Sequence, residues 1–132
     1  MKNSPPIHIT QIPSLAKKIA SQLKGGEIFA LIGPLGAGKT AFVKAIGKAL
    51  KLKHHITSPT FTLLHGFPIK LSGRKIMLYH LDLYRTKNFK EVKALGLAEF
   101  WGQPHTITFI EWADKIKKHL PKKTQILTFF HE

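Results

Sequence analysis

The segment from residue 33 to residue 40 reads GPLGAGKT and constrains the fold of this chain more than any other feature. Its spacing, G-x-x-x-x-G-K-T, fits the P-loop consensus, in which glycines let the backbone curl until consecutive N–H groups point at phosphate oxygens. An almost wholly apolar run, 27–33, precedes it, and the apolar positions of 39–52 recur at helical spacing. A buried strand that opens through such a loop into a helix predicts an α/β domain with a phosphate site at the helix N-terminus.

The chemistry of this loop assigns a task to each residue type. We expect Lys39 to reach the β- and γ-phosphates of a nucleotide and the Thr40 hydroxyl to bind Mg²⁺. The residues expected to contact the nucleotide are Gly33, Leu35, Gly36, Ala37, Gly38, Lys39, Thr40 and Ala41.

Strand-like and helix-like patterns alternate along the rest of the chain. A length of 132 residues suits one domain, which we expect to cover 1–132. The patterns predict helices over 13–24, 39–52 and 113–120, a short helix opened by Asn88, strands over 27–33, 105–112 and 125–130, and a hairpin of 60–69 with 75–83. The expected architecture is a three-layer, P-loop NTPase-like α/β fold with a mainly parallel central sheet and an inserted β-hairpin.

Composition narrows the class of protein. The chain is 43% hydrophobic and 21% charged, has no cysteine, and shows neither a membrane-length apolar run nor an apolar signal core near its start. We therefore expect a cytoplasmic globular protein without disulfides or thiolate metal sites, and no membrane partner. The eight histidines lack the spacing of a metal site.

The charge balance is strongly basic, with 21 Lys+Arg against 7 Asp+Glu and a formal net charge of +14. Such a charge attracts polyanions, so RNA or an acidic protein surface is a candidate partner. The lysines lie in scattered pairs rather than in one arginine-rich stripe, which is equally typical of a merely solvated surface.

Hydrolysis or transfer needs an acid near the metal, and two acids stand at the ends of predicted strands. Glu111 stands at the end of TITFIE and Asp82 at the end of the alternating run IMLYHLDLY, and carboxyl ends of strands are where ligands gather in open α/β sheets. We favour Glu111 as the Mg²⁺ partner of the loop. Asp82 has two alternative interpretations, a salt bridge with Arg85 or a solvated strand end. His80 shares the strand face of Asp82 and is a possible neighbour of the site.

Hydroxyl residues flank a proline at 57–60, after the helix that follows the loop. Thr57 or Thr60 there would supply a switch-type hydroxyl that senses the γ-phosphate, with a plain turn as the alternative.

Four blocks together are far more specific than the loop alone: GPLGAGKT, SPTF at 58–61, YHLDLYR at 79–85 and IEW at 110–112. In this order and spacing they resemble the TsaE family, formerly called YjeE. The resemblance implies a Mg-dependent P-loop ATPase, slow without its partners, that acts on the TsaB and TsaD proteins. Their complex forms N6-threonylcarbamoyladenosine at position 37 of bacterial tRNA; contact with tRNA itself would be indirect or weak.

The resemblance also implies roles for individual positions. Lys39, Asp82 and Glu111 would be catalytic, and Thr40 and Glu111 would bind Mg²⁺. The other implied members of the site are Ser14 near the nucleotide, Ser58 and Thr60 in a switch-like loop, and His80, Arg85 and Trp112 as neighbours.

Two departures from the family pattern stand out. Pro34 replaces the acid that is common after the first loop glycine. The sequence also ends at Glu132, before an arginine-containing segment that many members carry, so any nucleotide contact from that segment is in doubt.

Two rival functions remain open from the sequence. A small-molecule kinase would neutralise the transferred phosphoryl group with several arginines on a lid, whereas this chain has only Arg74 and Arg85 and no lid-sized insertion. A basic RNA-binding module with a regulatory nucleotide site would keep its RNA affinity in a Lys39→Ala variant.

Overall fold

The computed structural model describes residues 2–34, 36–52 and 63–131. The strands are β1 (Lys2–Asn3), β2 (Ile7–His8), β3 (Ile28–Ile32), β4 (Leu64–Leu71), β5 (Arg74–Asp82), β6 (Thr106–Glu111) and β7 (Gln125–Phe130). The helices are α1 (Ile12–Gln22), α2 (Lys39–Ala49) and α3 (Phe89–Ala94), with 3-10 segments η1 (Ile9–Gln11) and η2 (Ala113–His119). No helix in these described ranges has the length and apolarity needed to cross a membrane.

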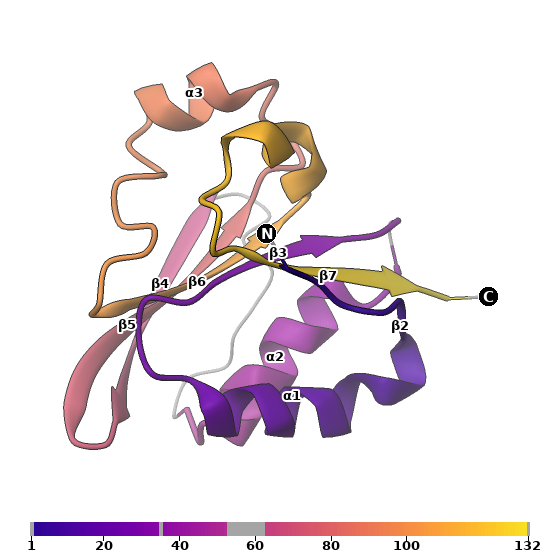
Figure 1. Ribbon diagram of the computed structural model, residues 1–132, viewed down its shortest axis with the longest axis vertical. Helices are drawn as coiled ribbons and strands as arrows, with labels where there is room; N and C mark the ends of the chain where they lie inside the picture. Colours follow the sequence, from indigo (N-terminus) through magenta and orange to yellow (C-terminus); the bar gives the residue numbers. More distant parts are fainter. Residues whose placement is uncertain (1, 35, 53–62, 132) are drawn as a thin grey trace.

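The strands form one sheet in the order β1-β7-β3-β6-β5-β4, with β2 also paired to β7. Every pairing is parallel except that of β4 with β5. In Figure 1, α1 and α2 cover one face of the sheet, while α3 and η2 lie on the other. The three-layer, mainly parallel α/β fold expected from the sequence is confirmed.

The central strand β3 explains why its sequence is apolar at nearly every position. Phe29 and Leu31 enter the core beneath α1 and α2, whereas Ile28 and Ala30 enter the core on the opposite face. Phe29 stacks on Phe109 of β6, with ring centroids 4.8 Å apart. A strand buried on both faces has no solvent-facing side, so alternation disappears from its sequence.

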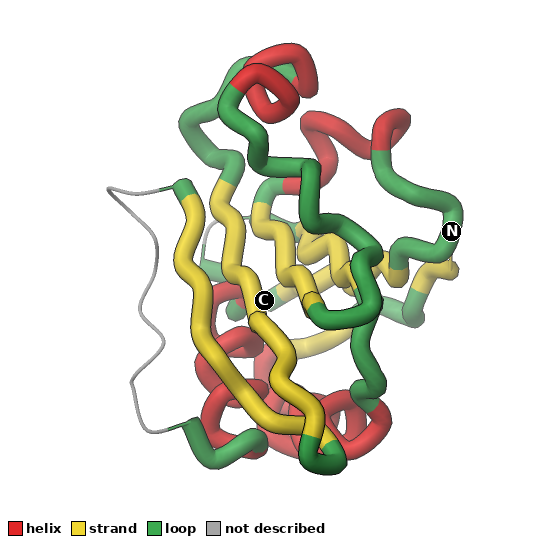
Figure 2. The backbone as a smooth tube through the Cα atoms, turned by 90° about the vertical axis from the view of Figure 1, so that its left-hand side faces the viewer, coloured by secondary structure: helices red, strands yellow, loops and turns green. Residues whose placement is uncertain are grey.

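The predicted hairpin is β4 with β5, and its long antiparallel ribbon is visible in Figure 2. Leu71 pairs with Arg74, so the loop has two residues, Ser72 with φ 50° and Gly73 with φ 79°. Two positive φ angles are those of a type I′ turn, whose twist matches that of the flanking strands.

Two short segments of the fold escaped sequence analysis. β1 and β2 have two residues each and add to β7, which lies more than a hundred positions away. A strand of two residues is too short to show an alternating pattern in the sequence, so only its long-range pairing reveals it.

The basic helix expected at 113–120 is instead the 3-10 segment η2, broken at Ile116 (φ −126°), whose side chain is buried against the sheet. Packing has overridden local helix propensity there.

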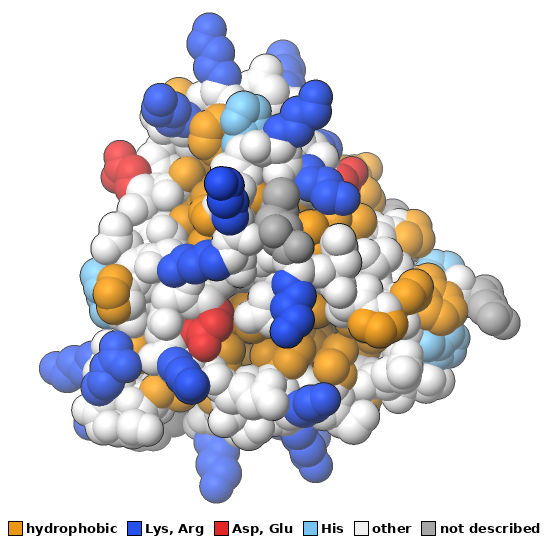
Figure 3. All heavy atoms as spheres, in the orientation of Figure 1, with side chains coloured by type: hydrophobic (Ala, Val, Ile, Leu, Met, Phe, Trp, Pro, Cys, Tyr) orange, Lys and Arg blue, Asp and Glu red, His pale blue; other side chains and the backbone are white. Residues whose placement is uncertain are grey.

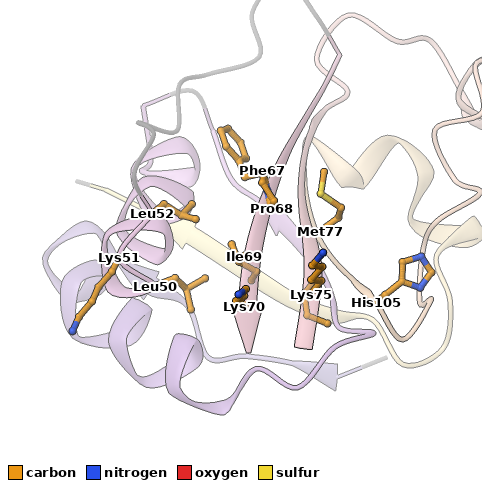
Figure 4. A pocket seen from close by; sticks show the side chains of 11 residues that line it. Leu50, Lys51, Leu52, Phe67, Pro68, Ile69, Lys70, Lys75, Met77 and His105 are labelled. Atoms are coloured by element: carbon orange, nitrogen blue, oxygen red, sulfur yellow. The ribbon is translucent and has the colours of Figure 1, made fainter. Parts of the chain in front are cut away.

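Lysine and arginine side chains are spread over the face seen in Figure 3 rather than gathered in one patch. A hollow of about 780 Å³ lies beside the hairpin, where Leu50 and Leu52 face Ile69 of β4 (Figure 4). Its lining includes Lys75 at the start of β5 and His105 just before β6. Lys75 and His105 mark the amino ends of β5 and β6, at the edge of the sheet opposite the P-loop.

Candidate nucleotide site

The P-loop joins the end of β3 to the first turn of α2, and its glycines are needed where they stand. Gly33 has φ 153°, and a Cβ atom there would lie 2.6 Å from the Phe129 carbonyl oxygen. Gly38 caps α2 with φ 104°, and its Cβ would lie 2.5 Å from Ile12 Cδ1. The loop is thus pressed between β7 and the start of α1, in a backbone conformation that side chains disfavour.

Lys39 is buried at the base of this loop, with 4% of its surface exposed. Its Nζ donates to the carbonyl oxygens of Gly33 and Pro34 and lies 3.6 Å from the centroid of the Trp112 ring. Burial lowers the pKa of the ammonium group, and the negative charge of Glu111 partly opposes that shift. The partners of the ammonium, two carbonyl oxygens and a ring, carry no net charge, so a negatively charged phosphate would outcompete them.

Glu111 lies beside the loop because β6 is the neighbour of β3, with Leu31 in register with Glu111. The Thr40 hydroxyl is 2.9 Å from Glu111 Oε1 and 2.8 Å from Oε2, and donates its hydrogen to this carboxylate. The hydroxyl lone pairs therefore stay available for a cation.

Asp82 is in register with Glu111 across β5 and β6, so both acids stand at the carboxyl edge of the sheet. Asp82 Oδ1 accepts a hydrogen bond from Tyr84 N at 2.9 Å. Burial is the main cause that raises the pKa of Asp82, and the nearby Glu111 charge raises it further. Within the described ranges Asp82 forms no salt bridge with Arg85, which is exposed. That alternative from the sequence is wrong.

His80 is fully buried on β5, and its Nε2 lies 2.5 Å from Glu111 Oε2. The sequence predicts His80 only as a possible neighbour of the site. The structure makes Glu111 its partner, because the parallel register sets His80 opposite Phe109, two residues before the acid.

Among the remaining positions, Trp112 lies over Lys39, and Ala37 is buried beneath the loop. Ala41 is exposed on α2, and Ser14 is exposed in the first turn of α1, where its hydroxyl donates to the Gln11 carbonyl at 3.3 Å. Leu35, Thr57, Ser58 and Thr60 lie outside the described residues.

A supporting pair escaped the sequence analysis. The Tyr84 ring lies 5.0 Å from that of Trp112, and Lys115 Nζ donates to the carbonyl oxygens of Tyr84 and, at 3.0 Å, Thr86. These contacts join the end of β5, near Asp82, to the Trp112 ring that lies against Lys39. Membership of the YHLDLYR block could have identified Tyr84, but no sequence motif pointed to Lys115.

The donor set at the loop suits a magnesium ion. Within the described part of the chain no three His, Cys, Asp or Glu side chains gather into a metal site of their own. Thr40 and Glu111 provide one hydroxyl and one carboxylate, and Mg²⁺ is usually held by one or two such oxygen groups together with substrate phosphates and water. The residues fit the ion.

Comparison with known proteins points to one family. A model of the family described as "Threonylcarbamoyl adenosine biosynthesis protein TsaE" matches residues 8–132. The chain belongs to the TsaE family. A TsaE protein of Aquifex aeolicus is 44% identical over 105 residues, which cover 78% of this chain and 70% of the relative. The TsaE of Bacillus subtilis is 36% identical over 111 residues, covering 83% of this chain and 65% of the relative.

Both relatives are described as tRNA threonylcarbamoyladenosine biosynthesis proteins. The crystal structure of YdiB from Bacillus subtilis superimposes with a TM-score of 0.62 at 31% identity, covering 92% of this chain and 72% of that one. This TsaE chain therefore has the P-loop fold. It spans about two thirds of the length of several relatives it matches.

Proposed function

We propose that this TsaE chain is a Mg-dependent ATPase of the cytoplasmic machinery that forms N6-threonylcarbamoyladenosine at position 37 of tRNA, and that it acts on the TsaB–TsaD pair. The names of its relatives support the pathway. The observation that carries the activity is the convergence of Lys39, Thr40 and Glu111 at the N-terminus of α2.

Each residue has a distinct part in this mechanism. Backbone N–H groups of the loop and the N-terminus of α2 bind the phosphates, and Lys39 exchanges its carbonyl partners for phosphate oxygens. Mg²⁺, when bound, neutralises charge on the phosphates and aligns them. The Thr40 hydroxyl would supply a lone pair to the ion, while Glu111 accepts the hydroxyl hydrogen. Asp82, whose pKa is raised by burial, is our candidate for the group that accepts a proton from the attacking water.

The placement of one arginine supports the proposed need for partners. Arg74 donates to the carbonyl oxygens of Lys24 (3.0 Å) and Pro104 (3.2 Å), at the amino end of β5 and away from the loop. Arg85 is exposed. In P-loop enzymes an arginine near the transferring phosphoryl group often accelerates hydrolysis by 10³–10⁵-fold. Because Arg74 is held away from the loop, we expect the isolated chain to hydrolyse ATP slowly and a docked partner to stimulate it.

The test measures ATP hydrolysis by the chain alone and with TsaB and TsaD. We expect stimulation by the pair and its loss in Lys39→Ala and Glu111→Ala. Lys44→Ala, an exposed lysine on the same helix, is the matched control and should retain activity. If the rate of ATP hydrolysis changes neither on addition of TsaB and TsaD nor in Glu111→Ala, the proposal is wrong.

The same assay separates the rivals left open by the sequence. Phosphoryl transfer to a small molecule without TsaB and TsaD would favour a kinase. Salt-sensitive RNA binding that survives Lys39→Ala, without partner-dependent hydrolysis, would favour an RNA-binding module.

A further inference from the structure

A fully buried histidine lies against the acid of the candidate metal site. His80 is 0% exposed, and its Nε2 contacts Glu111 Oε2 at 2.5 Å, while the same carboxylate accepts the Thr40 hydroxyl hydrogen. Glu111 is itself only 3% exposed. The three side chains form one continuous chain of hydrogen bonds, from the interior of the sheet to the first turn of α2.

The other ring nitrogen of His80 indicates which partner donates the hydrogen in this contact. Within the described residues His80 Nδ1 is buried without a hydrogen-bond partner. A hydrogen on Nδ1 would be a buried donor with nothing to bind, so the hydrogen that serves this contact lies on Nε2, which donates it to Glu111.

Space-filling alone does not account for this histidine. Leu78, two residues earlier on the same face of β5, is also 0% exposed and fills its space with apolar atoms alone. A leucine at position 80 would fill the interior without leaving a polar atom unpaired. The imidazole adds one thing that leucine lacks, a donor aimed at Glu111.

We propose that His80 is a positioning residue for the Mg²⁺ site. By donating to Oε2 it fixes the orientation of the Glu111 carboxylate. The carboxylate in turn holds the Thr40 hydroxyl hydrogen, so the hydroxyl lone pairs would be free for the ion. Hydrogen bonds to the groups around a metal typically change metal affinity by 10–100-fold. This inference rests on the proposed function, because it concerns the ion that accompanies the nucleotide.

The experiment measures ADP binding to the full chain by calorimetry, with EDTA and across a Mg²⁺ titration. In His80→Leu we expect the half-saturating Mg²⁺ concentration to rise about tenfold, while ADP affinity in EDTA changes less than about twofold. His80→Gln, whose side-chain amide still donates toward Glu111, should recover most of the Mg²⁺ affinity. Leu78→Val is the matched control for loss of core packing and should leave the Mg²⁺ midpoint unchanged.

An unchanged Mg²⁺ midpoint in His80→Leu, or an equal shift in Leu78→Val, would overturn the positioning role while leaving the proposed function intact. A wild-type chain that binds no ADP would overturn the proposed function. A wild-type chain whose ADP affinity does not change with Mg²⁺ concentration would overturn the metal site and this inference together. Thermal unfolding checks that the variants fold. If His80→Leu does not fold, His80→Met, which is apolar and unbranched, takes its place with the same expected shift.

Discussion

The hydrogen bond between Thr40 and Glu111 leads to a prediction about stability in the absence of any ligand. Thr40→Val keeps the shape of the side chain but removes the hydroxyl that lies 2.8 and 2.9 Å from the two carboxylate oxygens. Hydrogen bonds to charged groups contribute about 1.5–3 kcal/mol, and Glu111 is too buried for water to replace the lost donor fully. We therefore expect a loss of about 2 kcal/mol in the free energy of unfolding.

The expected change in melting temperature follows from the length of the chain. Unfolding entropy near the midpoint is about 2.1 cal/mol/K per residue, so 132 residues give roughly 0.28 kcal/mol/K and a decrease of about 7 °C. Thermal and urea unfolding followed by circular dichroism measure both quantities. Thr40→Ser retains the hydroxyl and loses one half-buried methyl group, so it should cost only about 0.5 kcal/mol.

The reasoning is refuted if Thr40→Val is no less stable than Thr40→Ser. A double-mutant cycle with Glu111→Gln gives an independent check, because residues in direct contact couple by about 0.5–3 kcal/mol. Additivity of the two substitutions would mean that the two side chains do not interact.

Three further outcomes are expected. Gly33→Ala should lower stability more than Gly36→Ala, because only the former sets a Cβ within 2.6 Å of a backbone oxygen, and paired urea unfolding curves measure the difference. Because the pKa of Asp82 is raised in the folded state, its charged form disfavours folding, and Asp82→Asn should be more stable than the parent at neutral pH. The gain in stability should vanish as pH falls below the pKa of Asp82 in the unfolded chain, and denaturation across a pH series tests this. ADP binding should change the fluorescence of Trp112 as Lys39 leaves its ring, and Trp112→Phe should abolish that response while the other tryptophan still emits.

Local signals determined most of the phosphate site. The glycine positions, the apolar strand and the amphipathic helix are all adjacent in sequence, and the P-loop conformation depends on the freedom of those glycines. The two acids near strand ends were also readable, because Asp82 and Glu111 each come late in an apolar or alternating run. The TsaE resemblance was carried by the four short blocks. The roles assigned to the site residues stay predictions.

Tertiary structure decided which of these residues meet. Strand order is set by pairings between segments far apart in sequence, and no local pattern shows that β6 lies between β3 and β5. That order brings Glu111 to Thr40, leaves Asp82 one strand further away, and aims the buried His80 at the same carboxylate. The sequence by itself determined that a phosphate loop and two strand-end acids exist; the long-range register determined how they are connected, because a hydrogen bond depends on ångström distances that spacing along the chain does not specify.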